Sequence, residues 1–215
     1  MNAAVASLQV GRIAPLGPEG VPSGFVKRAV TRPVATGTLG LAGDEQADLS
    51  VHGGPDKAVY AYAASRYPTW AEAFPPLAGR FVGGSMGENL TVTGLDEDNL
   101  CVGDVHRIGT ALLQVCQPRQ PCFKLALAFG EPRLGKHMVR SGHSGWYYAV
   151  VREGELGPGD AVERMERPNP DFAFARLVTI VNRGDATPDE LARLAEMPGV
   201  AGRIAQRARA ALDGG

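Results

Sequence analysis

Cysteine and histidine are scarce in this chain of 215 residues, which has only three cysteines and four histidines. No CxxC pair occurs, which excludes a zinc ribbon, a thioredoxin-like centre and an iron–sulfur cysteine set. No HExxH motif occurs either, which excludes the common helical zinc-protease site. Three cysteines cannot form a complete set of disulfides, so we expect reduced thiols and a cytoplasmic protein.

Long apolar runs and an excess of one charge are also missing. No apolar stretch reaches the roughly 20 residues that span a bilayer, and the N-terminus has no signal-peptide pattern. The formal net charge is -1, so we expect neither a nucleic-acid polymer nor a membrane surface as partner. The chain has no P-loop, no dinucleotide fingerprint and no pyridoxal-phosphate lysine motif, so we do not expect those cofactors.

Glycine and proline are abundant, with 28 and 16 residues, which predicts many tight turns between short strands. We therefore predict a mainly β fold, a β-barrel with flanking short helices, over residues 1–168. A helix is expected at 65–74, because apolar residues recur there at helical spacing. Residues 167–170 are proline-rich and predicted to be a linker. Residues 169–215 then form a three-helix domain, with an N-cap, proline and capping-box pattern at 187–190. The predicted strands are 5–13, 26–30, 57–62, 89–93, 105–109, 111–115, 146–151 and 161–164.

The segment 117–124, Gln-Pro-Arg-Gln-Pro-Cys-Phe-Lys, carries the most distinctive chemistry. It follows a strand-like run and precedes a helix-like run, so Cys122 is predicted at a helix N-terminus between Arg119 and Lys124. Each of these surroundings favours thiolate over thiol, and a thiolate is a nucleophile or a ligand for a soft metal. The alternative is that Cys122 is a small buried apolar residue, as free cysteines commonly are.

Three further segments combine glycine with polar or cationic side chains. Residues 47–57 contain His52 and Lys57 around a Gly-Gly pair, and residues 83–89 form a glycine-rich turn that ends at Asn89. Residues 140–146 begin with Arg140 and precede a strong strand pattern. Backbone amides of such turns bind anions, and arginine suits phosphate or carboxylate groups. Ordinary surface turns remain the alternative for all three.

Taken together in this order, these motifs resemble the MOSC family, named for the C-terminal domain of molybdenum-cofactor sulfurases. The resemblance rests on His-Gly-Gly-Pro-Asp-Lys at 52–57, Gly-Glu-Asn-Leu at 87–90 and the segment 117–124. Residues 40–48 and 140–147 look like the YiiM-like branch of that family, as does the three-helix tail. The resemblance implies a MOSC β-barrel that binds the molybdenum cofactor, a pterin-dithiolene with a phosphate.

The resemblance also implies roles for individual residues. Cys122 matches the family's thiol and is expected to coordinate molybdenum. Lys27, Lys57, Arg119 and Arg140 are candidates for binding the cofactor's phosphate and pterin, with Asn89 as a polar contact and His52 as a polar contact or proton shuttle. The implied reaction reduces N-hydroxylated compounds, such as hydroxylaminopurine bases, to amines. Because the chain has no redox cofactor motif of its own, an external flavoprotein is the expected electron donor.

Other readings remain open at this point. The same pocket would serve a non-catalytic module that carries molybdenum cofactor or sulfur, and the thiol alone would serve as a persulfide carrier. Cys116 stands where this branch is expected to have serine, which leaves open a second thiol near the metal or a Cys116–Cys122 disulfide. The apolar C-terminal helices are compatible with a homodimer.

Overall fold

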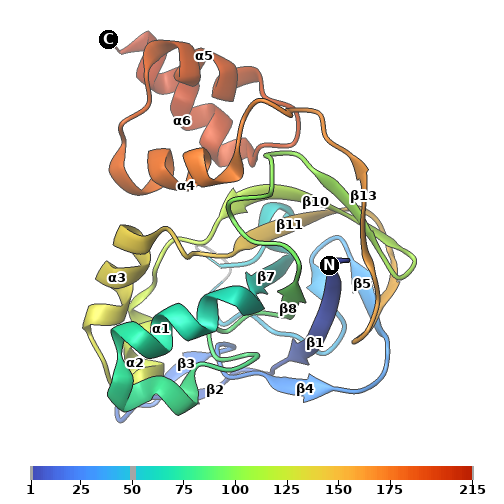
Figure 1. The fold of residues 1–215 in the computed structure, drawn as a ribbon, viewed down its shortest axis with the longest axis vertical. Helices are drawn as coiled ribbons and strands as arrows, with labels where there is room; N and C mark the ends of the chain where they lie inside the picture. The colour runs from blue at the N-terminus through green and yellow to red at the C-terminus, as the bar shows by residue number, and fades with distance from the viewer. Residues whose placement is uncertain (1, 49–51, 215) are drawn as a thin grey trace.

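The computed structural model describes residues 2–48 and 52–214. Its centre is an eight-stranded sheet, whose strands can be followed in Figure 1. The order across the sheet is β13-β9-β10-β11-β7-β8-β1-β4. Only β7 and β8 run parallel among these neighbours, and the other pairs are antiparallel. The strands are β1 Ala4–Val10, β4 Arg28–Val30, β7 Val59–Ala63, β8 Leu90–Thr93, β9 Val105–Ile108, β10 Ala111–Pro118, β11 Trp146–Arg152 and β13 Val162–Glu166.

Two smaller sheets lie beside the large one. The first has the order β12-β5-β6, and the second is the hairpin of β2 and β3. The hairpin predicted over 105–115 is confirmed as β9 and β10, which pair Ala111 with Ile108. The bounds of the smaller strands are β2 Ala14–Leu16, β3 Val21–Ser23, β5 Val34–Gly37, β6 Gly40–Leu41 and β12 Gly154–Leu156.

The mainly β expectation holds for residues up to 168, but a closed barrel is not confirmed. The ladder of the large sheet ends at β13 on one side and β4 on the other. The start of β1 approaches the start of β13 through one isolated bridge, Ala4 to Ala161. Val162 N donates to Ala3 O at 2.9 Å beside that bridge. The bridge brings β13 back toward β1, so the sheet is curled. The order of paired strands still ends at β13 and at β4, so the sheet is open.

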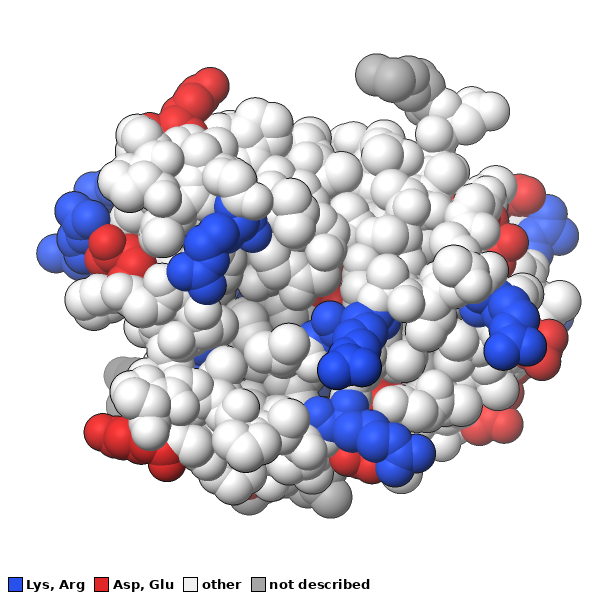
Figure 2. Space-filling view, turned by 90° about the horizontal axis from the view of Figure 1, so that it is seen from below, with Lys and Arg blue, Asp and Glu red and all other residues white. Residues whose placement is uncertain are grey.

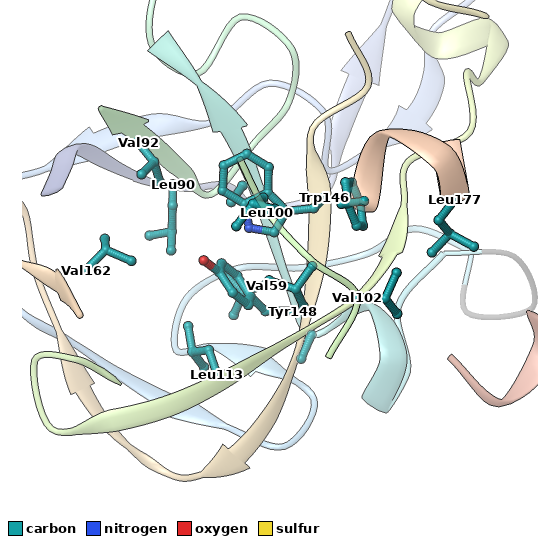
Figure 3. Close-up of a cluster of buried hydrophobic side chains, with 14 of the residues drawn as sticks. Val59, Leu90, Val92, Leu100, Val102, Leu113, Trp146, Tyr148, Val162 and Leu177 are labelled. Atoms are coloured by element: carbon teal, nitrogen blue, oxygen red, sulfur yellow. The ribbon is translucent and has the colours of Figure 1, made fainter. Parts of the chain in front are cut away.

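Buried apolar side chains explain why these segments form strands. All five residues of β7, Val-Tyr-Ala-Tyr-Ala, are buried, which suits a central strand covered on both faces. In Figure 3, side chains such as Val59, Leu113 and Tyr148 converge from different strands on one core. Leu177 of the C-terminal helices belongs to the same cluster, near Val102. The helices and the sheet thus share one hydrophobic core.

Short helices cover one end of the sheet around Trp70, which is fully buried. The predicted helix over 65–74 is confirmed as α1, Tyr67–Ala73, and α2 spans Phe123–Phe129. The structure adds α3, Arg133–Ser141, which the sequence analysis missed. Leu134 and Met138, four residues apart, are buried on one face of α3, and that burial stabilises so short a helix.

The three C-terminal helices are confirmed as α4 Phe174–Arg183, α5 Pro188–Glu196 and α6 Gly202–Asp213. The predicted capping box is present between Thr187 and Glu190. The segment predicted as a linker is instead fixed to both units. Asn169 is buried, and its Nδ2 donates to Val102 O at 2.8 Å and to Pro198 O at 2.9 Å.

No helix in the described ranges is both long and apolar enough to cross a bilayer. On the face that Figure 2 shows, lysine and arginine side chains stand in separate groups with uncharged surface between them. Several of these groups lie beside acidic side chains on that face.

Candidate functional site

A cavity of about 310 Å³ opens where the β10–α2 connection meets the loops before β4 and β7. The cavity is the place where most of the predicted site residues meet, although they lie far apart in the sequence. Cationic side chains dominate its charged lining, since the acidic side chains among the residues described there are Asp44 and Glu45. The lysines and arginines that line it are Lys27, Lys57, Arg119, Lys124, Arg203 and Arg207.

Cys122 lies at the edge of this cavity in the position that the sequence predicted. It is the N-cap residue of α2, with an extended backbone, and Leu125 N donates to its carbonyl oxygen at 3.0 Å. The side chain is half-buried, and Sγ lies 3.7 Å from Nε2 of His52. This Cys–His contact joins residues 70 positions apart, and no local pattern in the sequence indicated it.

Arg119 is a buried cation in the wall of the cavity. Its Nη1 donates to the Tyr60 hydroxyl at 3.3 Å and also bonds the carbonyl oxygen of Met86. The guanidinium lies over the rings of Tyr60 and Phe25, at 5.0 and 5.5 Å from their centroids. Cation–π contacts and hydrogen bonds fix the orientation of this charge before any ligand binds.

Lys27 and Asn89 meet at Asp44, which also lines the cavity. Lys27 Nζ forms a largely buried ion pair with Asp44, and burial is the largest cause of its lowered pKa. Asn89 Nδ2 donates to the same carboxylate at 2.9 Å, and its Oδ1 accepts from Tyr60 N at 3.1 Å. Because its polar atoms are engaged with the protein, Asn89 serves mainly to frame the cavity.

Lys57 and His52 come from the glycine-rich turn before β7. Lys57 ends a 3₁₀ turn, Pro55–Lys57, and does not belong to the strand in which it was predicted. Residues 49–51 of the predicted segment 47–57 lie outside the described residues. Burial lowers the pKa of His52, and nearby Lys124 and Lys57 lower it further, so the imidazole is neutral near pH 7. Burial and the charge of Arg203 lower the pKa of Lys57.

The glycine-rich turn 83–89 is held by the protein itself. Glu88 is fully buried, and its carboxylate accepts from Gly84 N at 2.6 Å and from Met86 N at 3.0 Å. These two amides already donate to Glu88, so they are not available to a ligand anion. The turn therefore acts as a connection between elements. Gly87 lines the cavity with φ of 78°, and a Cβ there would lie 2.9 Å from the Phe25 ring, so only glycine fits.

Arg140 and Cys116 do not join the others. Arg140 is exposed in the last turn of α3, where its Nη2 lies 3.2 Å from Nδ1 of His137, and it does not line the cavity. Cys116 is buried in β10, and its single S–H is shared between two carbonyl oxygens, Asp56 O at 3.1 Å and Tyr147 O at 3.4 Å from Sγ. Both thiols are free, so the disulfide with Cys122 that the sequence left open is not formed.

Arg203 and Arg207 of α6 line the cavity, and the sequence analysis missed them. They are four residues apart and thus lie on one face of the helix. Asp56 Oδ2 fixes the start of α6 by accepting from Gly202 N at 2.9 Å. The Arg-x-x-x-Arg spacing is visible in the sequence, but nothing local connects it with Asp56, which is 146 positions away.

The side chains around Cys122 suit a metal ion that arrives with most of its ligands already supplied by a cofactor. In the described ranges, no three His, Cys, Asp or Glu side chains come close enough together to hold a metal ion. A soft metal on Cys122 therefore needs further ligands from a cofactor. The cationic lining suits a cofactor that carries a phosphate.

Comparison with known proteins identifies the family of this chain. The family model of the MOSC domain matches residues 48–163, which is more than half of the length of the chain. The chain belongs to the MOSC family. It is 43% identical over 150 residues to Protein YiiM of Escherichia coli, covering 70% of this chain and 67% of that protein. It is also 43% identical over 166 residues to the uncharacterized protein YflK of Bacillus subtilis, covering 76% and 73% of the two chains.

Solved structures agree with this placement. The crystal structure of YiiM from Geobacillus stearothermophilus matches with a TM-score of 0.81 at 32% identity, covering 98% of this chain and 99% of that one. YiiM from Escherichia coli matches with a TM-score of 0.79 at 30% identity and 94% coverage of both chains. The predicted YiiM-like branch of the MOSC family is thus confirmed.

A fungal protein named "Reductase", from Gibberella moniliformis, is 34% identical over 179 residues. The match covers 83% of this chain and 32% of the fungal protein. The chain therefore spans about a third of that relative.

Proposed function

We propose that this protein binds the molybdenum cofactor in the cavity at Cys122 and reduces N-hydroxylated compounds to amines. The observation that carries the proposal is the half-buried Cys122 thiol at the edge of a cationic cavity, where the described residues offer too few further ligands to bind a metal alone. Membership of the MOSC family and the similarity to a protein named reductase support the same reading.

The residues of the cavity divide the binding of the cofactor between them. Cys122 supplies a sulfur ligand, and Lys57 and Arg119 bind the phosphate and the pterin. Lys27 acts with Asn89 through Asp44, and this triad shapes the wall. Arg140 is outside the cavity, so we leave it out of the proposed site. When bound, the molybdenum cofactor supplies a two-electron redox centre.

The reaction is R–NHOH + 2 e⁻ + 2 H⁺ → R–NH₂ + H₂O. The N–O bond breaks, and the departing oxygen leaves as water. Nε2 of His52, beside Cys122, passes a proton from solvent to that oxygen, and a neutral imidazole is able to take up and release protons in this way. The electrons come from an external reduced flavoprotein, and the natural substrates include hydroxylaminopurine bases.

The test begins with protein purified from a host that makes molybdenum cofactor. Molybdenum and pterin contents are measured, and turnover of 6-hydroxylaminopurine is followed with reduced methyl viologen as donor. Cys122→Ser is expected to lower both molybdenum content and turnover by at least about tenfold. Cys116→Ser is the matched control and is expected to keep both. Full molybdenum content and turnover in Cys122→Ser would disprove the central assignment.

A second candidate function is a carrier of molybdenum cofactor or sulfur without turnover. The contact between Cys122 and His52 favours it, because a thiol beside a histidine is activated as a nucleophile and suits a persulfide. In the same experiment, bound cofactor without turnover would support this carrier. Absence of cofactor together with a persulfide on Cys122 would support a sulfur carrier that needs no metal.

A further inference from the structure

The arginines of the C-terminal helices differ in their partners. Arg176, Arg193 and Arg209 form ion pairs with carboxylates of the same helical unit. Arg203 and Arg207 are exposed side chains that line the cavity instead. Arg183 of α4 also has no ion pair with a carboxylate of the described residues, but it lines neither this cavity nor its neighbour. No carboxylate within residues 2–48 and 52–214 lies at ion-pair distance from Arg203 or Arg207. Two neighbouring guanidiniums that have no carboxylate partner are able to bind a carboxylate or a phosphate group.

A second cavity, of about 240 Å³, adjoins the first at these arginines. Arg203, Arg207 and Lys57 line both cavities. The second cavity lies between the β10–α2 connection and the C-terminal helices. Its far wall is aliphatic, and the side chains that form it are Ile180, Val181, Leu191, Leu194, Ile204 and Ala208.

Helix α6 explains how a polar and an apolar surface meet there. Ile204 and Ala208 each follow one of the arginines by one residue, so they lie on the neighbouring face of α6. Asp56 anchors the start of the helix, and Ala201 N donates to Cys116 O of β10 at 3.0 Å, so both faces are set relative to β10. The junction therefore offers a metal-binding thiol on one side, a pair of guanidiniums in the middle and an aliphatic pocket on the other side.

We propose that the preferred substrate is an N-hydroxy amino acid with an apolar side chain, bound across both cavities. Its carboxylate lies between Arg203 and Arg207, its side chain enters the aliphatic cavity, and its N-hydroxyl group points to Cys122. In such a molecule these three groups are attached to one carbon, and the three surroundings adjoin one another because the two arginines line both cavities. The inference rests on the proposed function and names its substrate class.

The reaction balances as R–CH(COO⁻)–NHOH + 2 e⁻ + 2 H⁺ → R–CH(COO⁻)–NH₂ + H₂O. The N–O bond breaks, the amino acid and water are released, and the reduced flavoprotein is oxidised. The carboxylate is not changed, so the arginines bind ground state and transition state equally. Their removal is therefore expected to raise KM and to leave kcat nearly unchanged.

The test compares N-hydroxyleucine with the neutral 6-hydroxylaminopurine in steady-state kinetics of the cofactor-loaded protein. In the double variant Arg203→Gln/Arg207→Gln, KM for N-hydroxyleucine is expected to rise about tenfold or more, because charge-assisted hydrogen bonds are lost. With wild type and variant compared at equal molybdenum content, KM for hydroxylaminopurine is expected to stay within about twofold, because this base has no carboxylate for the arginines to bind. Arg209→Gln, on the same helix but paired with Glu196, is the matched control and should change neither.

Two further measurements separate the parts of the inference. N-hydroxyglycine should have a KM at least about tenfold above that of N-hydroxyleucine, because it leaves the aliphatic cavity empty. Calorimetric binding of 2-hydroxy-4-methylpentanoate, which the enzyme cannot reduce in this way, should weaken about tenfold in the double variant. Circular dichroism and thermal melting of each variant verify that the fold is kept.

Equal changes in KM for the acid and the base in the double variant would overturn the inference. So would turnover of hydroxylaminopurine by a protein that neither binds the hydroxy acid nor reduces N-hydroxyleucine, and in that case the proposed function would stand. Arginine-dependent binding of the hydroxy acid without turnover of either N-hydroxy compound would support the anion site and count against the proposed function.

Discussion

The cavity and the interior of the sheet each contain one thiol and one imidazole, and the two regions treat them in opposite ways. Cys122 and His52 are half-buried, 3.7 Å apart, at the edge of a cationic cavity. Cys116 is only six residues from Cys122 but is buried in β10. His106 is buried in β9 and hydrogen-bonded to the Tyr148 hydroxyl at 2.7 Å.

The difference between the regions follows from how deeply each side chain is buried. Burial raises the pKa of the Cys116 thiol, and its hydrogen bonds to backbone oxygens hold the proton in place. Burial lowers the pKa of His106 to about 4. Both groups are therefore neutral and act in packing. The chain leaves the sheet between Cys116 and Cys122, and that exit separates an inert thiol from an accessible one.

The largest expected contrast is in alkylation by iodoacetamide. In the folded protein at pH 8, Cys122 should react at least about a hundredfold faster than Cys116, because alkylation requires an accessible thiolate. Cys101 should also be slow, because it is buried and burial raises its pKa. Mass spectrometry should thus find one modification, and peptide mapping should place it on Cys122.

Two controls sharpen this contrast. The unfolded chain in guanidinium chloride should take up three labels, and folded Cys122→Ser should take up almost none. Labelling of Cys116 at a rate comparable to Cys122 in the folded protein would contradict the division into an inert and an accessible thiol.

The second contrast is between the two histidines and concerns stability against pH. His106 has a lowered pKa in the folded state, so the unfolded chain binds its proton more readily. Its contribution to stability is complete above the unfolded pKa near 6.5 and is lost as pH falls toward 4. Between pH 7.5 and pH 5 the free energy of unfolding should fall by about 2 kcal/mol from this group alone.

Urea unfolding of the wild type and of His106→Gln at both pH values measures this term. The variant should be less stable at pH 7.5, but its loss between the two pH values should be smaller by about 2 kcal/mol. His52→Gln should change the pH dependence much less, because His52 is only half-buried. An unchanged pH dependence in His106→Gln would show that His106 does not act as a buried neutral group.

The same contrast shows how far sequence can predict this site. The position of Cys122 at a strand-to-helix turn was predictable because proline, strand pattern and helix pattern are all local signals. The capping box at Thr187 was predictable for the same reason. The contact of His52 with Cys122 and the approach of α6 to Asp56 depend on packing between distant segments, which no local pattern encodes.

The segment at Arg140 shows the limit of local glycine and polar signals. The glycines and polar residues at 140–146 indicated a loop, and the resemblance to a family motif suggested a cofactor contact. In the structure, α3 continues through Ser141, because Leu134 and Met138 bury one face of the helix. The sequence of this helix is mostly polar, so these two buried residues gave too weak a helical pattern to predict it. Gly142, with φ of 75°, then ends the helix, and Arg140 is left exposed outside the cavity.

The smallest expected contrast is in the stability cost of removing each thiol. Cys116→Ala should destabilise the protein by about 1–2 kcal/mol, because it leaves a small void and removes the S–H that Asp56 O and Tyr147 O share. Cys116→Ser should recover part of the loss, since its hydroxyl can still donate to Asp56 O. Cys122→Ala should change the free energy of unfolding by less than about 0.5 kcal/mol, because this thiol is only half-buried at the cavity edge. Denaturant unfolding of the three variants at pH 7.5 measures the series. Equal losses of stability in the two alanine variants would mean that Cys122 is a packing residue. The cavity edge would then not be where this thiol acts.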